Sequence, residues 1–164
     1  MDYQGHGFRD PRLAYLFDYW RSKKGERIAA SRTDLLPSEI KHFLPIMNLI
    51  DVRRDPLRFR HRLVGTEIVD RLGRDVTGEL VSAELYGPAY ERVFEGLKAV
   101  AEEVRPYRRL TRLSWYDRSW LSVESLELPL IDSGGEVNMI LRAASHFSAA
   151  QHDGRDCEVW PLAA

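Results

Sequence analysis

The segment FRHRLVGTEIVDRLGRDVTG, residues 59–78, restricts the possible folds more than any other part of the sequence. Its first residues alternate between apolar and basic side chains, which is typical of a β-strand with one buried face. Thr66 can cap a short helix over residues 67–72, and Gly73 follows where helices commonly end in a left-handed residue. A helix of this length is stable only when it packs on another element. The segment therefore predicts a strand and a short helix in one layered unit.

Further strand-like runs lie on both sides of this segment. Residues 46–52 are apolar and β-branched, and residues 57–65 alternate after a short turn, so an antiparallel pair is expected. Residues 107–116 and 120–130 predict a second pair, and an Asp-Ser-Gly-Gly turn precedes a closing strand at residues 136–145. Because the later connections are too short for crossovers, we predict an α+β fold with an antiparallel sheet.

Two longer segments have the apolar spacing of amphipathic helices. Residues 11–24 follow Asp10 and stop at Gly25, and residues 88–104 begin at a proline and stop before Pro106. Each helix is apolar on one side only, so each must cover another surface. In the first helix the apolar stripe consists of Leu13, Leu16, Phe17 and Trp20.

The composition excludes several classes of protein. A formal net charge of -1 with 30 % charged residues provides no basic field, so neither nucleic acid nor a membrane surface is an expected partner. The single Cys157 cannot form an internal disulfide, and no Cys or His cluster has the spacing of a metal site. No apolar run reaches the roughly 18 residues of a membrane span, and the first residues lack the apolar core of a signal peptide. We therefore expect a cytoplasmic protein.

Residues 46–146 together resemble a PAS domain. The similarity is greatest to a short bacterial PAS family, which carries an N-terminal FDYWRSKKG helix, an LLPSEIKHFLP turn and the FRHRLVGTEIVDRLGRDVTG block. The Gly65 and Thr66 pair, the LGRDVTG motif and the LPLIDSGGEVNMIL motif stand where the family has comparable residues. Each motif is weak alone, but their order and the lengths of the elements between them are specific.

The resemblance implies a five-stranded antiparallel sheet with short helices and one long helix on one face, preceded by the N-terminal amphipathic helix. In some family members the core opens into a cavity for a small molecule, and the domain acts in sensing or in protein association. The expected boundaries are a helical cap over residues 1–45, the PAS domain over 46–146 and a C-terminal tail over 147–164. The tail is either disordered or docks Trp160 and Leu162 on the sheet or on a neighbour.

The best-known PAS cofactors leave residue signatures that this chain lacks. Flavin photochemistry by adduct formation needs a cysteine in the helical segment before the long helix, whereas Cys157 lies in the predicted tail. Haem of the oxygen-sensor kind needs an axial histidine on the long helix, and residues 88–104 contain none, although ligation from another element stays open. We therefore expect no cofactor, and an unknown small ligand remains an alternative.

His61 and several arginines are the polar candidates for a binding site. His61 shares a predicted face with Phe59 and Leu63, so its imidazole either makes a structural hydrogen bond or lines a cavity. The strand arginines could grip a carboxylate or phosphate, although a solvated face paired with Glu124 and Glu127 is the preferred interpretation. These arginines are Arg58, Arg60, Arg62, Arg108, Arg109 and Arg112. The candidate ligand-binding residues are His61, Arg60, Arg62, Ile68, Leu72, Leu97 and Trp115.

Two apolar features indicate contacts with other proteins. Trp115 and Trp120 flank a turn, and they are either an exposed docking patch or half-buried structural residues. The stripe of the first helix covers either its own sheet or a second copy, because it is too apolar for solvent. The second alternative predicts a homodimer through Leu13, Leu16, Phe17 and Trp20.

No catalytic arrangement stands out in the sequence. Ser145 and His146 are adjacent rather than placed as a nucleophile and its base, no Gly-x-Ser-x-Gly motif occurs, and no acidic pair is singled out. His42 and His146 have no partner ligand at metal spacing. We therefore predict neither enzyme activity nor a metal site.

The predicted function is that of a stand-alone PAS sensory or regulatory domain in bacterial signal transduction, which binds a small ligand, a protein partner or both. The runner-up is a ligand-free scaffold for dimerisation or protein interaction. A small enzyme or lipid carrier on a similar α+β fold is the third hypothesis.

Overall fold

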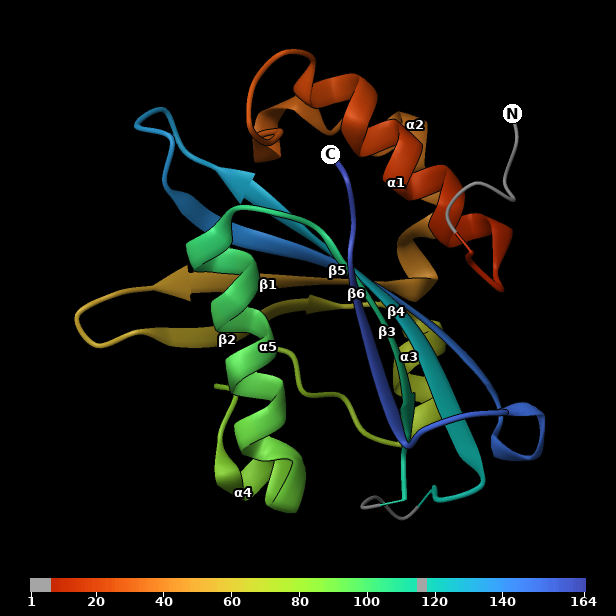
Figure 1. The fold of residues 1–164 in the computed structure, drawn as a ribbon. Coiled ribbons are helices and arrows are strands. Elements are labelled where there is room, and N and C mark those ends of the chain that lie inside the picture. Colours follow the sequence, from red (N-terminus) through yellow and green to blue (C-terminus); the bar gives the residue numbers. More distant parts are fainter. Residues whose placement is uncertain (1–6, 115–117) are drawn as a thin grey trace.

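The computed structural model describes residues 7–114 and 118–164, which form one antiparallel sheet with helices packed on it (Figure 1). The sheet has six strands in the order β2-β1-β5-β4-β3-β6, and every pairing is antiparallel. The α+β class and the five predicted strands are confirmed. The strands are β1 (Met47–Arg53), β2 (Arg58–Val64), β3 (Tyr107–Arg112), β4 (Leu121–Ile131), β5 (Val137–Ser148) and β6 (Cys157–Pro161).

The sixth strand, β6, comes from the segment expected to be a tail. It pairs with β3, with Cys157 opposite Thr111. Leu162 is buried just beyond the strand, and the Trp160 ring lies 4.5 Å from the guanidinium carbon of Arg108. The expected sheet is therefore one strand too small. Local pattern could not reveal β6, because the strand that holds it is distant in the sequence.

The helices follow the predicted pattern closely. They are α1 (Pro11–Lys24), α2 (Pro37–Ile40), α3 (Thr66–Leu72), α4 (Ala83–Tyr86) and α5 (Tyr90–Glu103), with 3₁₀ turns at Arg32–Asp34, Lys41–Ile46, Gly87–Ala89 and Ala149–Gln151. Asp10 caps α1 by accepting a hydrogen bond from the backbone N–H of Arg12, and Gly25 follows its last turn. Within the described ranges, none of the helices has both the length and the apolar character needed to cross a membrane.

The junction between β2 and α3 corrects one detail of the prediction. Gly65, rather than Thr66, occupies the cap position of α3, and its N–H donates to the carbonyl oxygen of Met47 at 2.7 Å. A Cβ atom at position 65 would lie 2.3 Å from the carbonyl oxygen of Pro45, so only glycine fits. The helix ends at Gly73, whose φ of 73° lies in the left-handed region as predicted.

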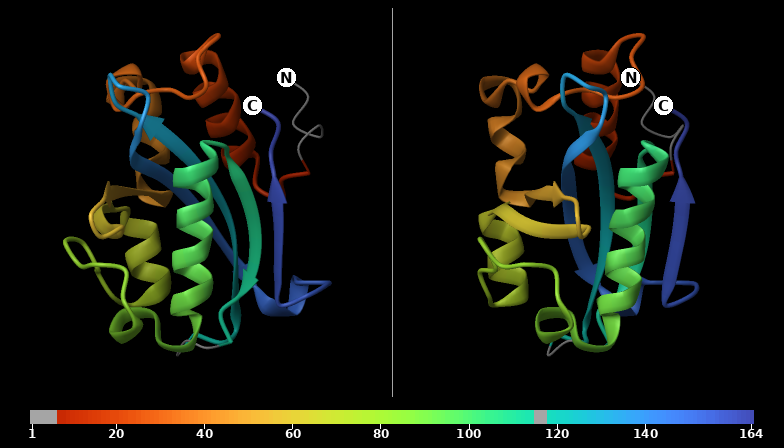
Figure 2. Two further views of the ribbon diagram at one scale, coloured as in Figure 1. Left: turned by 60° about the vertical axis from the view of Figure 1, so that its left-hand side comes forward. Right: turned by 90° about the vertical axis from the view of Figure 1, so that its left-hand side faces the viewer.

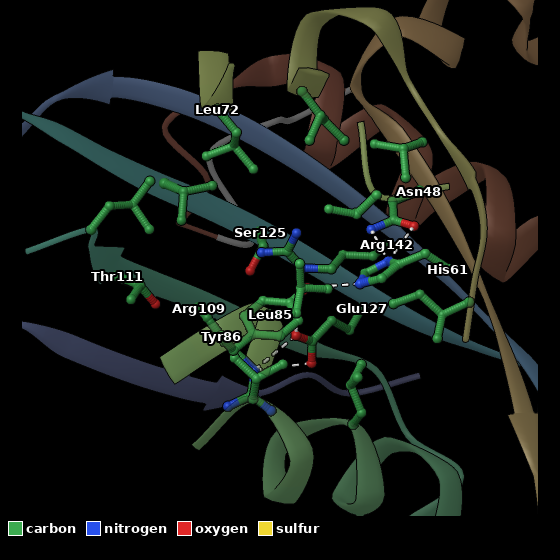
Figure 3. Close-up of a pocket in the computed structure, with 18 of the residues that line it drawn as sticks. Asn48, His61, Leu72, Leu85, Tyr86, Arg109, Thr111, Ser125, Glu127 and Arg142 are labelled. Carbon is green, nitrogen blue, oxygen red and sulfur yellow. Dashed lines mark hydrogen bonds and ion pairs between the residues drawn. The ribbon is translucent and has the colours of Figure 1, made fainter. Parts of the chain in front are cut away.

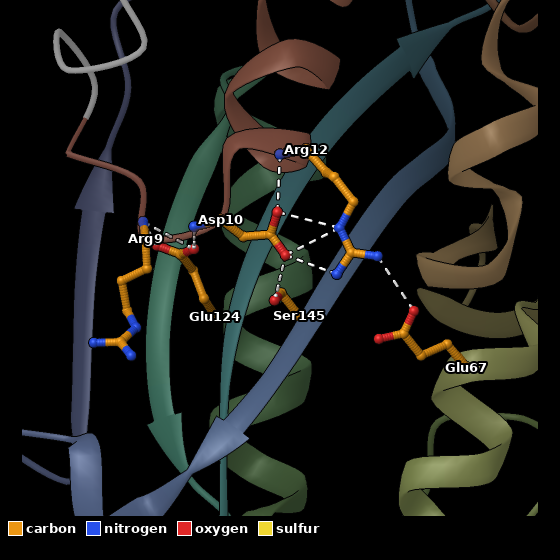
Figure 4. A network of polar contacts seen from close by, with 6 residues as sticks. All are labelled: Arg9, Asp10, Arg12, Glu67, Glu124 and Ser145. Carbon is orange, nitrogen blue, oxygen red and sulfur yellow. Dashed lines mark hydrogen bonds and ion pairs between the residues drawn. The ribbon is translucent and has the colours of Figure 1, made fainter.

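The sheet is covered on both faces (Figure 2). Every residue of β4 is buried, which requires a helical layer on each side. Alternate side chains of a strand point to opposite faces, so Glu124 lies on one face and Ser125 and Glu127 lie on the other. We call the α1 side, where Glu124 meets the N-terminal segment, the outer face, and the side of α3, α4 and α5 the inner face. Figure 4 shows α1 and α5 on opposite sides of the strands.

The apolar stripe of α1 covers the outer face of the chain's own sheet. Leu13, Phe17 and Trp20 are 0 % exposed and Leu16 is 1 % exposed. The indole N–H of Trp20 also donates to the carbonyl oxygen of Pro129 in β4 at 2.9 Å. This burial corrects the predicted dimer interface through these four residues, because their apolar surface is already covered within one chain. A homodimer through another surface stays a prediction.

A buried carboxylate holds the N-terminal segment on the outer face (Figure 4). The Glu124 side chain accepts hydrogen bonds from the backbone N–H of Arg9 at 2.9 Å, from that of Asp10 at 2.9 Å and from the guanidinium group of Arg108 at 2.7 Å. The side chains of Arg108 and Glu124 are 8 % and 1 % exposed. The expected pairing with Glu124 is therefore confirmed, but the pair is buried rather than solvated.

The same network connects the sheet to two helices. Asp10 accepts a hydrogen bond from Ser145 Oγ in β5 at 2.6 Å, and it pairs with Arg12 at 2.7 Å. Arg12 also reaches Glu67 of α3 at 3.3 Å. Residues at the start of α1 therefore contact both the central strands and α3.

A β-bulge reverses the side-chain alternation near the end of β2. The pairing register with β1 shifts between Leu49 and Ile50, which leaves one extra residue in β2. His61 is 2 % exposed, but Leu63, predicted on the same face, is 42 % exposed. Val64 points inward instead and lines the cavity described below.

The role of α1 as part of the core can be tested by stability. Trp20→Ala removes a fully buried side chain and should lower the free energy of unfolding by about 3–5 kcal/mol in urea denaturation. Trp120→Ala is the matched control, because Trp120 is 57 % exposed and its loss should change stability by less than about 0.5 kcal/mol. A Trp20→Ala protein of unchanged stability but altered oligomeric state would contradict this assignment.

Candidate ligand-binding cavity

A cavity of about 130 Å³ lies between the inner face of the sheet and the helices α3, α4 and α5 (Figure 3). Alternate residues of the central strands line it, because side chains two residues apart share a face. These are Val123, Ser125 and Glu127 from β4, and Arg142 and His146 from β5. The volume is close to the roughly 150 Å³ of an apolar cavity known to hold benzene.

Much of the lining is apolar. The predicted candidates Ile68 and Leu72 reach the cavity from α3, and Leu97 reaches it from α5, so the structure brings these three residues together. The other apolar side chains around the cavity are Ile50, Val64, Val76, Leu85, Val93, Leu113 and Val123.

His61 is the central residue of a hydrogen-bonded chain in the cavity wall (Figure 3). Its Nε2 lies 2.8 Å from the hydroxyl of Tyr86, and its Nδ1 lies 3.2 Å from Nδ2 and 3.3 Å from Oδ1 of Asn48. Burial and, to a smaller extent, the positive charge of Arg142 lower the pKa of His61 to about 4. The imidazole is therefore neutral at pH 7. His61 makes structural hydrogen bonds and also lines the cavity, two roles that the sequence analysis treated as alternatives.

Arg109 and Glu127 form an ion pair in the lining. Arg109 Nε lies 3.0 Å and 2.9 Å from the two carboxylate oxygens of Glu127, and Arg109 Nη2 donates to the carbonyl oxygen of Gly96 in α5 at 3.3 Å. The guanidinium group passes so close to α5 that a Cβ atom at Gly96 would lie 2.9 Å from it. The predicted pairing with Glu127 is confirmed, but the side chains are only 13 % and 6 % exposed, so this face is not solvated.

Arg142 projects from β5 into the same cavity. Its Nε lies 4.0 Å from Glu127, and that carboxylate is already held by Arg109 at shorter distances. Among the described residues, Glu127 is the single acidic side chain that lines the cavity. Two guanidinium groups therefore share one carboxylate.

His146 and Cys157 add further polar groups. Burial, followed by the positive charges of Arg142 and Arg71, lowers the pKa of His146 to about 4. The Nδ1 atom of His146 is buried and has no hydrogen-bond partner in the part of the chain that the structure describes. Cys157 reaches the cavity because β6 lies beside β3, where Cys157 Sγ is 3.8 Å from Thr111 Oγ1. Among the same described residues, no three His, Cys, Asp or Glu side chains gather as a metal site would require.

Some predicted residues lie elsewhere. Arg60 and Arg62 are exposed and do not line the cavity, and Arg62 lies 3.4 Å from Asp51 instead. The prediction for Trp115 falls outside the described residues, whereas Trp120 is exposed. The six strand arginines therefore do not form one anion site. Arg58, Arg60 and Arg62 are exposed, and Arg112 pairs with Asp156 at 3.2 Å. Arg108 lies on the outer face of the sheet, whereas Arg109 lies on the inner face.

Sequence reasoning did not assign Asn48, Tyr86 or Arg142 to a binding site. A signal was present for Arg142, which stands between Leu141 and Ala143 in an apolar strand, where a charged residue must be paired or have a function. Tyr86 gave no comparable signal, because its contact with His61 joins residues 25 positions apart.

The sheet, its two helical layers and the internal cavity define an α+β domain with an enclosed space between the sheet and its inner helices. The sequence matches the model of the PAS domain family over residues 8–144, and the chain belongs to this family. The resemblance is therefore confirmed, and the match includes α1. A comparison with curated proteins found no match. PAS domains are generally sensory or signalling domains rather than catalysts, so this chain is assigned to that general class.

The lowered histidine pKa values predict how stability depends on pH. Between about pH 6.5 and pH 4 the unfolded chain takes up protons on His61 and His146 that the folded chain does not. Stability should therefore be greatest above pH 6.5 and fall as the pH decreases toward 4. For His61 alone, the fall should be on the order of 3 kcal/mol.

Urea denaturation at about pH 7 and about pH 4.5 measures this effect. His61→Gln should lose less stability than the wild type over this interval, since glutamine takes up no proton. His42→Gln is the control, because His42 is exposed and its replacement should leave the pH dependence of the wild type unchanged. Equal losses in the wild type and His61→Gln would show that His61 is not responsible.

Proposed function

We propose that this PAS domain binds a small organic molecule in its cavity and communicates the bound state to a protein partner. The observation that carries the proposal is the mixed lining of the cavity. Apolar side chains of α3 and α5 surround the space together with Arg142 and the unpaired Nδ1 of His146. A core built only for stability pairs or excludes such polar groups, because burying them without partners is costly.

The position of α3 provides a route for communication. Ile68 and Leu72 on this helix line the cavity, whereas Glu67 contacts Arg12 near the start of α1 at 3.3 Å. A ligand that displaces α3 therefore also changes a contact on the N-terminal segment. Such coupling requires that the ligand bind the two arrangements of α3 with different affinity.

Thermal unfolding with a library of small metabolites tests ligand binding. A ligand at about 100 times its dissociation constant stabilises the folded state by about 2.7 kcal/mol. For a domain of this size that should raise Tm by roughly 5–10 °C. The same compound should have no effect on Val123→Phe, in which a larger ring fills the cavity, or on Ser125→Leu, a second filling variant.

Val159→Phe is the matched control for the first variant, because Val159 is 43 % exposed on β6 and does not line the cavity. It should respond to the ligand like the wild type. If no compound raises Tm and native mass spectrometry shows no bound molecule, the ligand-binding proposal fails and a ligand-free interaction scaffold is favoured. Stabilisation that persists in both filling variants would place the binding site elsewhere and also overturn the proposal.

A further inference from the structure

The charges around the cavity are unbalanced. Arg109 and Arg142 both approach Glu127, and no second acidic side chain lines the cavity within the described residues. His61 and His146 contribute no charge at pH 7, because the pKa of each is lowered to about 4. Glu127 is therefore shared by two guanidinium groups, and the positive charge at this position exceeds the negative charge by one.

Arg142 is the more weakly paired of the two arginines, and its side chain is 26 % exposed. Arg109 contacts both oxygens of Glu127 at 3.0 Å and 2.9 Å, whereas the Nε of Arg142 is 4.0 Å from the same carboxylate. Its charge also acts across the cavity, since it contributes to the lowered pKa of both His61 and His146. A guanidinium group in such an environment gains most from a bound carboxylate, whose two oxygens match its paired N–H donors.

The side chains around Arg142 limit the size and the polarity of the part of the ligand that does not contact Arg142. Ile68, Leu97 and Val123 provide an apolar wall, and the volume of about 130 Å³ suits a molecule of benzene-like size. The unpaired Nδ1 of His146 and the hydroxyl of Ser125 are available as additional hydrogen-bonding groups. Arg92 is an exposed lining residue, so its charge favours the approach of an anion from solvent, whereas Arg74 pairs with Glu79 at 3.1 Å.

We propose that the cavity binds a small monocarboxylate, with its carboxylate on Arg142 and its apolar part against Ile68, Leu97 and Val123. This inference rests on the proposed function and adds the chemical class of the ligand. A single carboxylate matches the single charge of Arg142. A doubly charged phosphate ester would carry one negative charge more than Arg142 balances, and this second charge would lie in a largely apolar space.

Isothermal titration calorimetry with matched acids and amides at pH 7 tests the charge requirement. The probes are benzoate against benzamide, and hexanoate against hexanamide, which have similar shapes but differ in charge. We expect at least one of the two acids to bind the wild type about tenfold or more tightly than its amide. Arg142→Gln should weaken binding of that acid by about tenfold to a hundredfold, because a hydrogen-bonded charge pair is lost. Binding of the amide should change by less than about threefold.

Two further variants test whether the guanidinium group of Arg142 itself is responsible for acid binding. Arg142→Lys keeps the charge without the paired donors, so its acid affinity should lie between those of the wild type and Arg142→Gln, and it serves if Arg142→Gln does not fold. Arg60→Gln is the control, because Arg60 is an exposed arginine outside the cavity and its loss should leave acid binding unchanged.

The results that would overturn the monocarboxylate inference differ from those that would overturn the proposed function. Equal binding of an acid and its amide, or full retention of acid binding in Arg142→Gln, overturns the monocarboxylate inference but leaves a cavity that binds small molecules. Absence of binding by both acids also overturns the inference. The proposed function then depends on the separate metabolite screen with the filling variants.

Discussion

The complete burial of β4 is the constraint on which the rest of the structure depends. Since every residue of this strand is buried, α1 must cover the outer face and α3, α4 and α5 must cover the inner face. The two acidic residues at the centre of β4, Glu124 and Glu127, point to opposite faces and cannot be solvated. Each therefore takes an arginine from the neighbouring β3, Arg108 outside and Arg109 inside, because an unpaired buried charge is costly.

The two faces differ in how completely these charges are satisfied. On the outer face, Glu124 accepts hydrogen bonds from Arg108 and from the backbone of Arg9 and Asp10, so its pairing also fastens the N-terminal segment. On the inner face, Glu127 meets a second arginine, Arg142, and the helices leave space beside it. The outer face is thus closed by hydrogen bonds to the N-terminal segment, whereas the inner face retains a cavity lined by a second arginine. This difference supports the proposed sensory role in a family whose members generally sense or signal.

The cavity and the start of the N-terminal helix are connected through α3. α3 touches the cavity with Ile68 and Leu72 and touches Arg12 with Glu67. β6 joins the sheet beside β3, places Cys157 in the cavity lining and sets Trp160 against Arg108. Segments from both ends of the described chain therefore contact the same buried strands.

The amino-acid sequence alone determined most of the local elements: the strands β1 to β5 with the hairpin at Asp132, the left-handed end of α3 at Gly73, and the apolar stripe of α1. It also identified Ile68, Leu72, Leu97 and His61 as candidate lining residues, and the structure places all four at one cavity. Periodicity shows that a side chain such as Trp20 must be buried, but it does not show against what, because the covering strand is more than a hundred residues away. Tertiary structure alone decided that α1 covers its own sheet, that β6 extends it, that a bulge turns Leu63 outward, and that Arg142 and Arg109 converge on Glu127. Each of these depends on contacts between different elements, and the pattern within a single element does not encode them.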